Sequence, residues 1–468
     1  SDSAFTPNFI YFRDIRYMPF LGFSEHYVLN SIVKRREFGL PELPVALSLE
    51  QDITKHDGDF SHQLKWATIE TRLTTAANHI AVAPGELISH FKDDYRNVYH
   101  YKTKQPIRKI QPVLSGVYTV SERDVDGINV EVYHIEKHTK IAQEHIEAIA
   151  DTLRYGNQNF GRYPYKQLRL FEVPNVFNQS GYAMPQMMLI DEKLGFVVDR
   201  SNDQAFDHLY RRTVHETAHQ WWGHGLDSAI TEGGSVLVET LAVYTQAQLL
   251  IQNYGEAYLH RFLQYENNRY LYGRGQSPET EKPLYRADEK HLIYSKGTIA
   301  MNAIQKQLGA NKVNEALKLV IKKHGYPNKP ATTLDFIHAL NTVTNFEHQD
   351  FIKQWLQQLV VNDWTIESTH VTTLESGLFS VDVCISNYAT TDNKSQLVEL
   401  ALFSEHPANL FDKPADNRTL LHTKVNVIQP NTCFNFEVLK RPEFIQLDPY
   451  YQSIDQQREN NTKRLAVL

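Results

Sequence analysis

Apolar and polar residues alternate along the first part of the chain, which is the period-two pattern of half-buried strands. Residues 63–84, "QLKWATIETRLTTAANHIAVAP", follow this pattern up to the turn at Pro84-Gly85. Residues 113–135, "VLSGVYTVSERDVDGINVEVYHI", predict a hairpin with Asp126-Gly127 as its turn. We therefore expect residues 1–120 to form a mainly β domain.

The apolar spacing then becomes helical. Residues 138–156 carry isoleucines and a leucine at helical spacing, and "KQLRLFEVPNV" follows as a short buried strand that stops at Pro174. Helices are predicted over 203–223, over 234–253 and onwards to about residue 360. Near the end of this region, Thr332 and Asp335 have the spacing of a capping box.

The last hundred residues return to strand patterns, for example "GLFSVDVCISNYA" and "QLVELALFS". They predict a small β-sandwich over residues 361–468, after an α/β and helical domain over 121–360. The fold class is thus multidomain α+β. Reactive side chains are expected where the β pattern gives way to helix.

Composition restricts the function classes. The chain has 468 residues, of which 41% are hydrophobic and 22% charged, and this describes a folded globular protein. Its net charge of −7 and the lack of a Lys/Arg run argue against nucleic-acid binding. No apolar run has the length of a transmembrane helix. The chain opens "SDSAFTPNF", without an initiator Met, and we expect it to be a piece of a longer protein.

The only two cysteines are Cys384 and Cys433. They are too few for a metal-thiolate cluster. One bridge between them and two free core thiols are both compatible with the sequence.

The stretch "RRTVHETAHQWWGHGLD" contains His215, Glu216 and His219 in the order H-E-x-x-H. Residues four apart lie on one face of a helix, so both histidines can present their rings to one ion. Catalytic zinc takes three protein ligands and leaves a position for water. Glu216 is then placed to act on that water.

A third ligand must come from elsewhere, and Glu239, on the next predicted helix, is our choice. A helix-turn-helix of this length can fold Glu239 back onto the histidines. His224 competes, but the positions three and six past His219 do not match the extended metzincin motif. Glu232 is a weaker competitor, because "ITEGGS" has the composition of a solvated turn.

The chain resembles gluzincins of the aminopeptidase N and leukotriene hydrolase family. "HETAHQWWGH" is similar to the family's zinc helix, "LVETLAVY" to its third-ligand helix, and "HLIYSKGTIAM" to its Tyr-x-Lys-Gly segment. The ending "LDPYYQSIDQQRENN" most resembles peptidase domains fused to bacterial ABC-transporter permease-like membrane proteins. The resemblance implies a thermolysin-like catalytic domain, one zinc ion and peptide hydrolysis. It also implies that Tyr294 assists the tetrahedral intermediate.

The sequence departs from the family pattern in two places. The spacing from His219 to Glu239 is one residue longer than usual, although the permease-associated subgroup shares it. In the family, a Gly-x-Met-Glu-Asn strand binds the free amino terminus of the substrate through its Glu. The matching stretch here is "SGYAMPQMMLI", in which Ala183 and Met184 agree but Pro185 and Gln186 replace the Glu and the Asn.

This second departure bears on the substrate. Proline has no carboxylate, so a substrate ammonium would lose a charge-assisted partner. The nearby Glu192 can substitute for it or be a solvated loop acid. Residues 183–186 are nevertheless our candidate substrate-binding set.

We therefore expect a zinc metallopeptidase in which His215, His219 and Glu239 hold the metal. Glu216 would act as general base and then acid, and Tyr294 would stabilise the oxyanion. Aminopeptidase and endopeptidase action both stay open because of Pro185. The alternative is a non-catalytic peptide-sensing module attached to a membrane transporter. The expected partner is a peptide substrate. A membrane-spanning portion of a longer parent chain and an extracytoplasmic location are expected by analogy alone. The sequence does not fix the oligomeric state.

Overall fold

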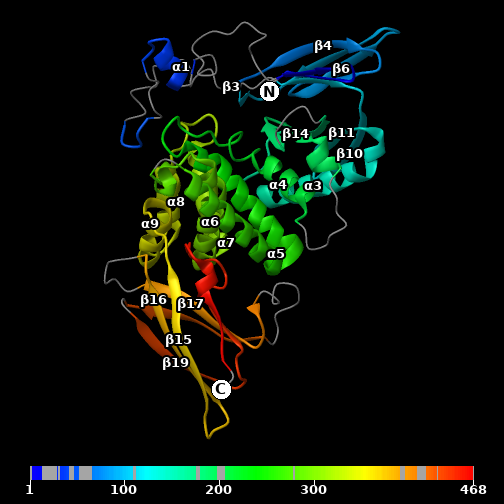
Figure 1. Cartoon of the computed structure of the whole chain (residues 1–468). Helices are drawn as coiled ribbons and strands as arrows, with labels where there is room; N and C mark the ends of the chain where they lie inside the picture. The colour runs from blue at the N-terminus through cyan, green and yellow to red at the C-terminus, as the bar shows by residue number, and fades with distance from the viewer. Residues whose placement is uncertain are drawn as a thin grey trace. The chain divides into compact units, whose positions relative to one another are not determined.

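The computed structural model describes residues 3–12, 29, 32–41, 47–51, 66–108, 112–174, 180–197, 206–277, 280–389, 396–407, 418–428 and 431–466. It contains two compact units: Ser1–Leu249 with Asn314–Ala339, and Leu250–Val313 with Leu340–Leu468. Along the sequence, a β-rich N-terminal region is followed by a helical region and a C-terminal β-sandwich (Figure 1). The predicted fold class is confirmed. The predicted domain limits at residues 120 and 360 stay predictions.

The N-terminal region of the first unit is built from short antiparallel sheets. One has the order β1-β2-β9-β5, another the order β4-β7-β6, and β3 pairs with β8. In the described part of this region, a short helix, α1 (Ile32–Glu37), accompanies them. The strand bounds are β1 Ser3–Thr6, β2 Phe9–Phe12, β3 Trp66–Ala67, β4 Glu70–Ala76, β5 Ile80–Val82, β6 Glu86–Lys92, β7 Arg96–Lys102, β8 Ile107–Arg108 and β9 Val113–Gly116.

A five-stranded sheet of order β10-β11-β12-β14-β13 follows in the same unit. Its predicted first hairpin is confirmed: Val125 pairs with Ile128, and Asp126 and Gly127 adopt φ values of 54° and 83°. Such positive φ values are those of a tight hairpin turn. The bounds are β10 Thr119–Val125, β11 Ile128–His134, β12 Gln167–Val173, β13 Gly181–Met184 and β14 Met187–Asp191.

One hydrophobic core joins the N-terminal sheets to this sheet. Side chains from both, including Tyr11 and Leu114 on one side and Phe171 and Met184 on the other, are 0% exposed and lie in a single cluster. Strand β12 is buried along its whole length, as expected of a central strand, although it contains Gln167, Arg169 and Glu172. The region before residue 120 is thus packed onto the sheet that leads to the H-E-x-x-H helix.

Helices α3 (Thr139–Asn159) and α4 (His208–Ala218) pack against each other, and α3 also covers β10 and β11 (Figure 1). The helix predicted over 203–223 is shorter than expected: it begins at His208 and ends at Ala218. Residues 203–205 lie outside the described residues. The remaining helices are α5 Leu241–Gln276, with non-helical Gly255 inside it, α6 Gly297–Leu308, α7 Ala310–His324, α8 Thr333–Val343 and α9 Gln349–Gln357.

The second helix, predicted over 234–253, also differs from its prediction. It opens with a π-helical turn at Val236–Thr240, and α5 continues well past residue 253. The predicted capping box at the start of α8 is confirmed. The Thr332 N–H donates to Asp335 Oδ2 at 2.9 Å, and the Asp335 N–H donates back to Thr332 Oγ1 at 3.4 Å.

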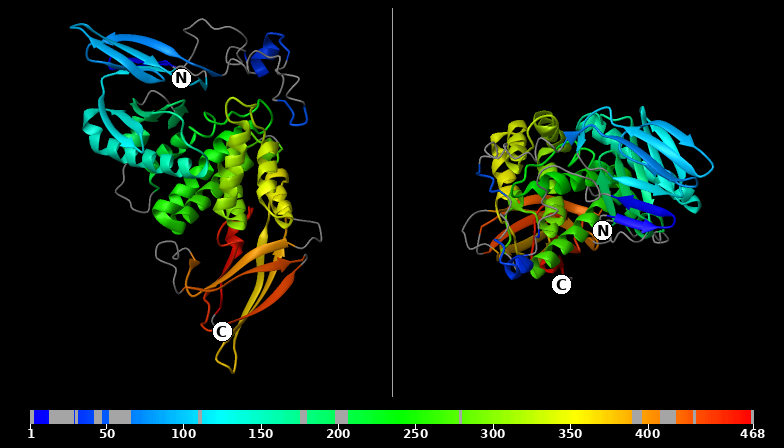
Figure 2. Two further views of the ribbon diagram at one scale, coloured as in Figure 1. Left: turned by 180° about the vertical axis from the view of Figure 1, so that it is seen from behind. Right: turned by 90° about the horizontal axis from the view of Figure 1, so that it is seen from above.

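The C-terminal part of the second unit is a sandwich of two antiparallel sheets, of order β15-β16-β19 and β18-β17-β20-β21 (Figure 2, yellow to red). Their inward-facing side chains form one apolar core. The bounds are β15 Trp364–Thr373, β16 Phe379–Asn387, β17 Gln396–Phe403, β18 Thr419–Val427, β19 Thr432–Val438, β20 Phe444–Leu447 and β21 Thr462–Arg464. Cys384 and Cys433 face each other on β16 and β19 and form a disulfide.

Within the described ranges, no helix combines the length and the apolar character needed to cross a membrane.

Candidate metal centre

Helix α4 presents the two histidines of the motif. Its start is fixed by Asp207, whose carboxylate accepts a hydrogen bond from the Tyr210 N–H at 2.9 Å. Its end is set by the residues after His219, where the chain turns and passes through Gly223 at φ 106°. The turn stops the helix before the predicted residue 223 but leaves His215 and His219 one turn apart.

Three ligand atoms meet beside this helix. His215 Nε2 and His219 Nε2 are 3.2 Å apart, and each lies 3.4 Å from Glu239 Oε2. Zinc–ligand bonds of about 2.0–2.1 Å in a tetrahedron require ligand atoms about 3.3–3.4 Å from one another. The three atoms therefore have the separations of one face of a tetrahedral zinc site.

The surroundings of His219 suit metal binding. Its Nδ1–H donates to the Trp222 carbonyl at 2.9 Å, which leaves Nε2 to face the other two ligands. Burial disfavours a charged His219, but the Glu239 carboxylate outweighs burial and raises the pKa of His219. For Glu239, burial is opposed by both histidines, which hold the pKa of its carboxyl well below the usual range. The Glu239 carboxylate is the group of this cluster that attracts a cation, and a metal ion bound at His219 Nε2 would compete with a proton there.

Glu216 lies on the same helix, is only 7% exposed and is not one of the three clustered ligands. Burial is the main cause that raises the pKa of its carboxyl. A carboxylate whose pKa is moved towards neutrality is better suited to accept and return a proton. Strand β13 runs directly against it: a Cβ added to Gly181 would lie 2.5 Å from Glu216 Oε1.

The two competing third ligands are not brought into this cluster. Among the described residues, the potential metal ligands that gather are His215, His219 and Glu239 in one place, and His138, Glu172 and Glu192 in another. His224 is buried, and burial lowers the pKa of its ring well below the usual value. Glu232 lies in the turn before the π-helical segment, where its N–H donates to the Leu47 carbonyl.

The candidate substrate-binding residues form the end of β13 and its turn into β14. Ala183, Met184, Pro185 and Gln186 are all buried. Met184 belongs to the hydrophobic core, and Gln186 occupies the left-handed region at φ 66°. The side chains at these positions are therefore packed inward.

Glu192 lies in the second group of potential metal ligands, with His138 and Glu172. His138 Nδ1 is 2.7 Å from Glu172 Oε1, and Lys137 Nζ is 3.6 Å from Glu192 Oε1. Glu192 is thus grouped with His138 and Glu172 and not with the clustered ligands of the H-E-x-x-H helix.

Tyr294 belongs to the second unit, where it lies in the π-helical turn His291–Lys296. The two residues after it are anchored. Ser295 Oγ donates to Glu266 Oε2 at 2.7 Å, and Lys296, only 1% exposed, pairs with Glu281. Lys296 is therefore a buried, structural residue.

Two residues near the metal ligands were not singled out by the sequence. Gly181 leaves space for the Glu216 carboxylate, and only the tertiary structure shows that the two residues lie next to each other. Gln220 follows His219 directly, and its side-chain amide bonds to the backbone of the β13–β14 turn. The stretch "HQWW", which contains Gln220, indicated a resemblance to the family's zinc helix but did not predict this contact.

The chain is similar to known proteins in sequence and in fold. Residues 144–355 match the family model described as Peptidase family M1 domain. Aminopeptidase 2 of Candida albicans is 25% identical over 325 residues, covering 66% of this chain and 33% of that protein. Endoplasmic reticulum aminopeptidase 1 of Homo sapiens is 22% identical over 317 residues, covering 62% and 32%.

Among solved structures, Legionella pneumophila aminopeptidase A in complex with aspartic acid is similar in fold. The TM-score is 0.58 at 14% identity, over 83% of this chain and 44% of that chain. The chain spans about a third of the length of the curated relatives that it matches. The part of this chain that carries the H-E-x-x-H helix is thus similar to the M1 peptidase domain, and both curated relatives are aminopeptidases by name.

Proposed function

We propose that this chain, with its M1 peptidase match over residues 144–355, is a zinc-dependent metallopeptidase that hydrolyses peptide bonds. The observation that carries the proposal is the triangle of His215 Nε2, His219 Nε2 and Glu239 Oε2, with sides of 3.2, 3.4 and 3.4 Å. These three residues would hold one zinc ion. When bound, zinc supplies Lewis-acid chemistry, polarising a carbonyl and acidifying water.

Glu216 is the proposed general base. It accepts a proton from the attacking water and returns it to the leaving amine. Its burial supports the assignment, because a desolvated carboxyl binds a proton more readily than a solvated one. A purely structural zinc site would not need an acid at this position.

Tyr294 is proposed to donate a hydrogen bond to the developing oxyanion. Losing a contact of this kind costs about 2.7–4 kcal/mol of transition-state stabilisation. The anchoring of Ser295 to Glu266 and of Lys296 to Glu281 supports the proposal, because it restrains the turn that carries the phenol.

Aminopeptidase action is the primary proposal because the relatives are aminopeptidases by name. Endopeptidase action is the second candidate, and Pro185 favours it. A buried proline offers no carboxylate to a substrate ammonium, an interaction that contributes about 1.5–3 kcal/mol where it is present. Residues 183–186 would then bind substrate through their backbone and not through a charged side chain.

Attachment to a membrane-spanning portion of a longer chain, with an extracytoplasmic peptidase, stays a proposal that rests on the resemblance alone. The catalytic domain limits of 121 and 360 are proposed from the sequence pattern. The single zinc ion is proposed from the spacing of the three ligand atoms.

The test is digestion of matched peptide pools, one with free and one with acetylated amino termini, followed by mass spectrometry. Single residues released only from free termini would establish an aminopeptidase. Internal cuts in both pools would establish an endopeptidase. Products no more abundant than with Glu216→Gln would reject peptide hydrolysis for these substrates and favour the sensing module.

A further inference from the structure

The turn between β13 and β14 holds a residue in an unfavourable backbone conformation. Gln186 has φ 66° and is 1% exposed. Residues other than glycine seldom adopt this left-handed region, and a buried one persists there only when its surroundings impose the conformation. The contacts of Gln186 therefore show what imposes it.

Gln220 clamps this turn from the side of the metal ligands. The Gln186 N–H donates to Gln220 Oε1 at 2.9 Å, and Gln220 Nε2 donates to the Met184 carbonyl at 3.0 Å. One amide side chain thus spans Pro185 and bonds to the backbone on both sides of it. Gln220 itself directly follows His219 in the chain.

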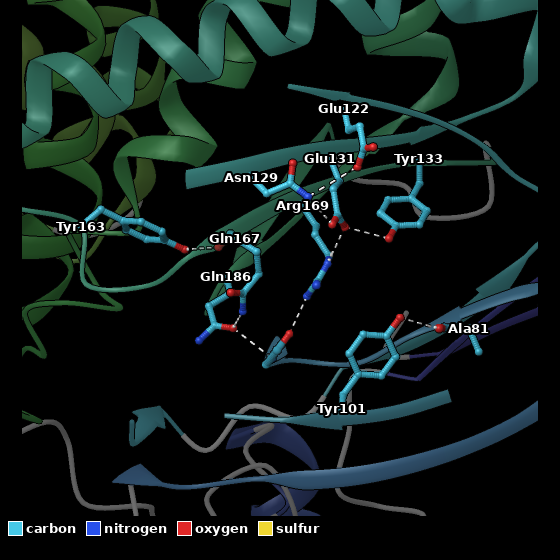
Figure 3. Close-up of polar contacts among 11 residues, drawn as sticks. Ala81, Tyr101, Glu122, Asn129, Glu131, Tyr133, Tyr163, Gln167, Arg169 and Gln186 are labelled. Carbon is cyan, nitrogen blue, oxygen red and sulfur yellow. Dashed lines mark hydrogen bonds and ion pairs between the residues drawn. The ribbon is translucent and has the colours of Figure 1, made fainter. Parts of the chain in front are cut away.

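The side chain of Gln186 extends the other way, to the N-terminal β region. Its Oε1 accepts hydrogen bonds from the Gly85 N–H at 2.9 Å and from Gln167 Nε2 at 2.6 Å (Figure 3). Gly85 has φ 103°, and a Cβ added there would lie 2.4 Å from the Lys102 carbonyl carbon. The Lys102 backbone therefore leaves no room for a side chain at position 85.

Arg169 completes the connection. It is 3% exposed; its Nη1 donates to the Gly85 carbonyl at 2.8 Å and its Nε to Glu131 Oε2 at 2.7 Å (Figure 3). Its backbone N–H donates to the Gln186 carbonyl at 3.1 Å. The backbone of Gly85 is thus held on both sides of its Cα, at the N–H by Gln186 and at the carbonyl by Arg169. A buried guanidinium with an ionic partner and several acceptors specifies one geometry.

We propose that Gln186 is a positioning residue for hydrolysis, which transmits the placement of the Gly85 turn to β13 and Gln220. This inference rests on the proposed peptidase function. Gln220 holds the turn next to His219, and β13 begins at Gly181, which lies against Glu216. The Gly85–Gln186–Gln220 chain of contacts therefore fixes β13 relative to the Glu216 carboxylate. The turn at Gly85, which lies more than a hundred residues before Glu216 in the sequence, thereby helps to position the proposed active site.

Two kinds of variant test the proposal. Gln186→Asn keeps an amide and suits the left-handed backbone, but its side chain is one methylene too short to reach Gly85. Gly85→Ala disturbs the turn from its far end. Its matched control is Gly127→Ala, which also has a positive φ, of 83°, but whose Cβ would meet nothing within 4 Å.

We expect Gln186→Asn and Gly85→Ala to lower kcat at least tenfold, with KM within threefold of the parent protein and zinc content unchanged. Hydrogen exchange of the peptide covering residues 181–191 should accelerate in both. Gly127→Ala should match the parent protein in every readout. If Gly85→Ala does not fold, the kcat and hydrogen exchange of Gln186→Asn still test the proposal.

A rise in KM with kcat unchanged would overturn the proposal and make Gln186 a substrate-binding residue. Parent-like kcat and exchange in Gln186→Asn would overturn it as well. If the parent protein cleaves no more than Glu216→Gln, the peptidase function fails. In that case, hydrogen exchange of residues 181–191 could still accelerate in Gln186→Asn and Gly85→Ala and not in Gly127→Ala. This result would show that Gln186 connects the Gly85 turn to β13 even though the chain is not a peptidase.

Discussion

Gly181 lies against Glu216: a Cβ built on Gly181 would be 2.5 Å from Glu216 Oε1 and 2.9 Å from Glu216 Cδ. Strand β13 is the outer strand of its sheet, so its first residue reaches the H-E-x-x-H helix without an intervening strand. Only a residue without a side chain allows this approach while Glu216 keeps its place. The contact joins the strand that carries the candidate substrate-binding residues to the proposed general base.

Gly181→Ala is expected to lower kcat about tenfold or more and to leave zinc content unchanged. The added methyl group displaces the Glu216 carboxylate, and general acid–base catalysis typically contributes 10²–10⁴-fold. Steady-state kinetics with one fluorogenic peptide would measure the effect. Gly275→Ala is the control, since a Cβ there meets nothing within 4 Å. Parent-like kcat in Gly181→Ala would show that Glu216 does not need this spacing.

Removing one partner of the buried Lys296–Glu281 pair should destabilise the second unit. Glu281 also accepts hydrogen bonds from Tyr270, at 2.8 Å, and pairs with Arg274 at 2.9 Å. Glu281→Gln leaves the Lys296 ammonium buried without its carboxylate, a change that typically costs about 3–5 kcal/mol. Urea unfolding followed by fluorescence would measure the loss.

The control for that experiment is Glu256→Gln, which breaks the pair with Lys306. Glu256 is 63% exposed, and an exposed pair contributes only about 0–1 kcal/mol. Equal destabilisation by the two variants would contradict a special role for the buried pair. Adding Lys296→Met to Glu281→Gln should recover part of the loss, because it removes the buried charge.

The stability of the first unit should depend on pH through Asp335. Burial tends to raise the pKa of this carboxyl, but hydrogen bonds from His324 and Thr332 outweigh burial and hold the pKa well below its usual range. A group whose pKa is lowered by folding stabilises the fold above its unfolded pKa, about 3.9, and this contribution is lost as pH falls through the folded pKa.

We therefore expect the parent protein to melt at a higher temperature than Asp335→Asn above about pH 5, and the difference to shrink as pH falls below about 4. Calorimetry of both proteins, freed of metal by chelation, at several pH values would measure this. A difference that is constant or grows as the pH falls would contradict the assigned role of Asp335.

Reducing the bridge between Cys384 and Cys433 should destabilise the β-sandwich. The two residues pair across β16 and β19, and Cys433 is exposed to reductant. Loss of a disulfide typically costs about 2–4 kcal/mol. A lower melting temperature with reductant, absent when both residues are replaced by serine, would support this. Identical melting with and without reductant would contradict it.

Local sequence signals predicted much of the fold. The Asp126-Gly127 turn, the capping pair Thr332 and Asp335 and the alternation in the C-terminal strands depend on neighbouring residues, and all three predictions are confirmed. The end of the H-E-x-x-H helix was wrong by five residues, because "HQWWGHG" keeps helix-compatible residues up to Gly223. After Ala218 the chain turns through local hydrogen bonds and passes Gly223 at φ 106°, and the Gly223 carbonyl accepts a hydrogen bond from the distant Arg108.

The spacing of His215 and His219, one helical turn apart, predicted that their rings would lie side by side, as they do. That they and Glu239 hold a metal stays a prediction. The π-helical turn that carries Glu239 was not predictable from the spacing of the apolar residues. The roles of Gly181, Gln186 and Gln220 had no local signal. Each depends on contacts between segments far apart in sequence, which period and composition do not encode.

The most direct measurement is zinc content and peptide hydrolysis on the same preparations of the parent protein, Glu216→Gln and His219→Ala. A zinc peptidase built on His215, His219 and Glu239 should bind one zinc ion and cleave. Glu216→Gln should keep the zinc but lose at least about 100-fold in rate, and His219→Ala should lose both. Cleavage by Glu216→Gln at the parent rate, or zinc bound equally well by His219→Ala, would contradict the proposed centre.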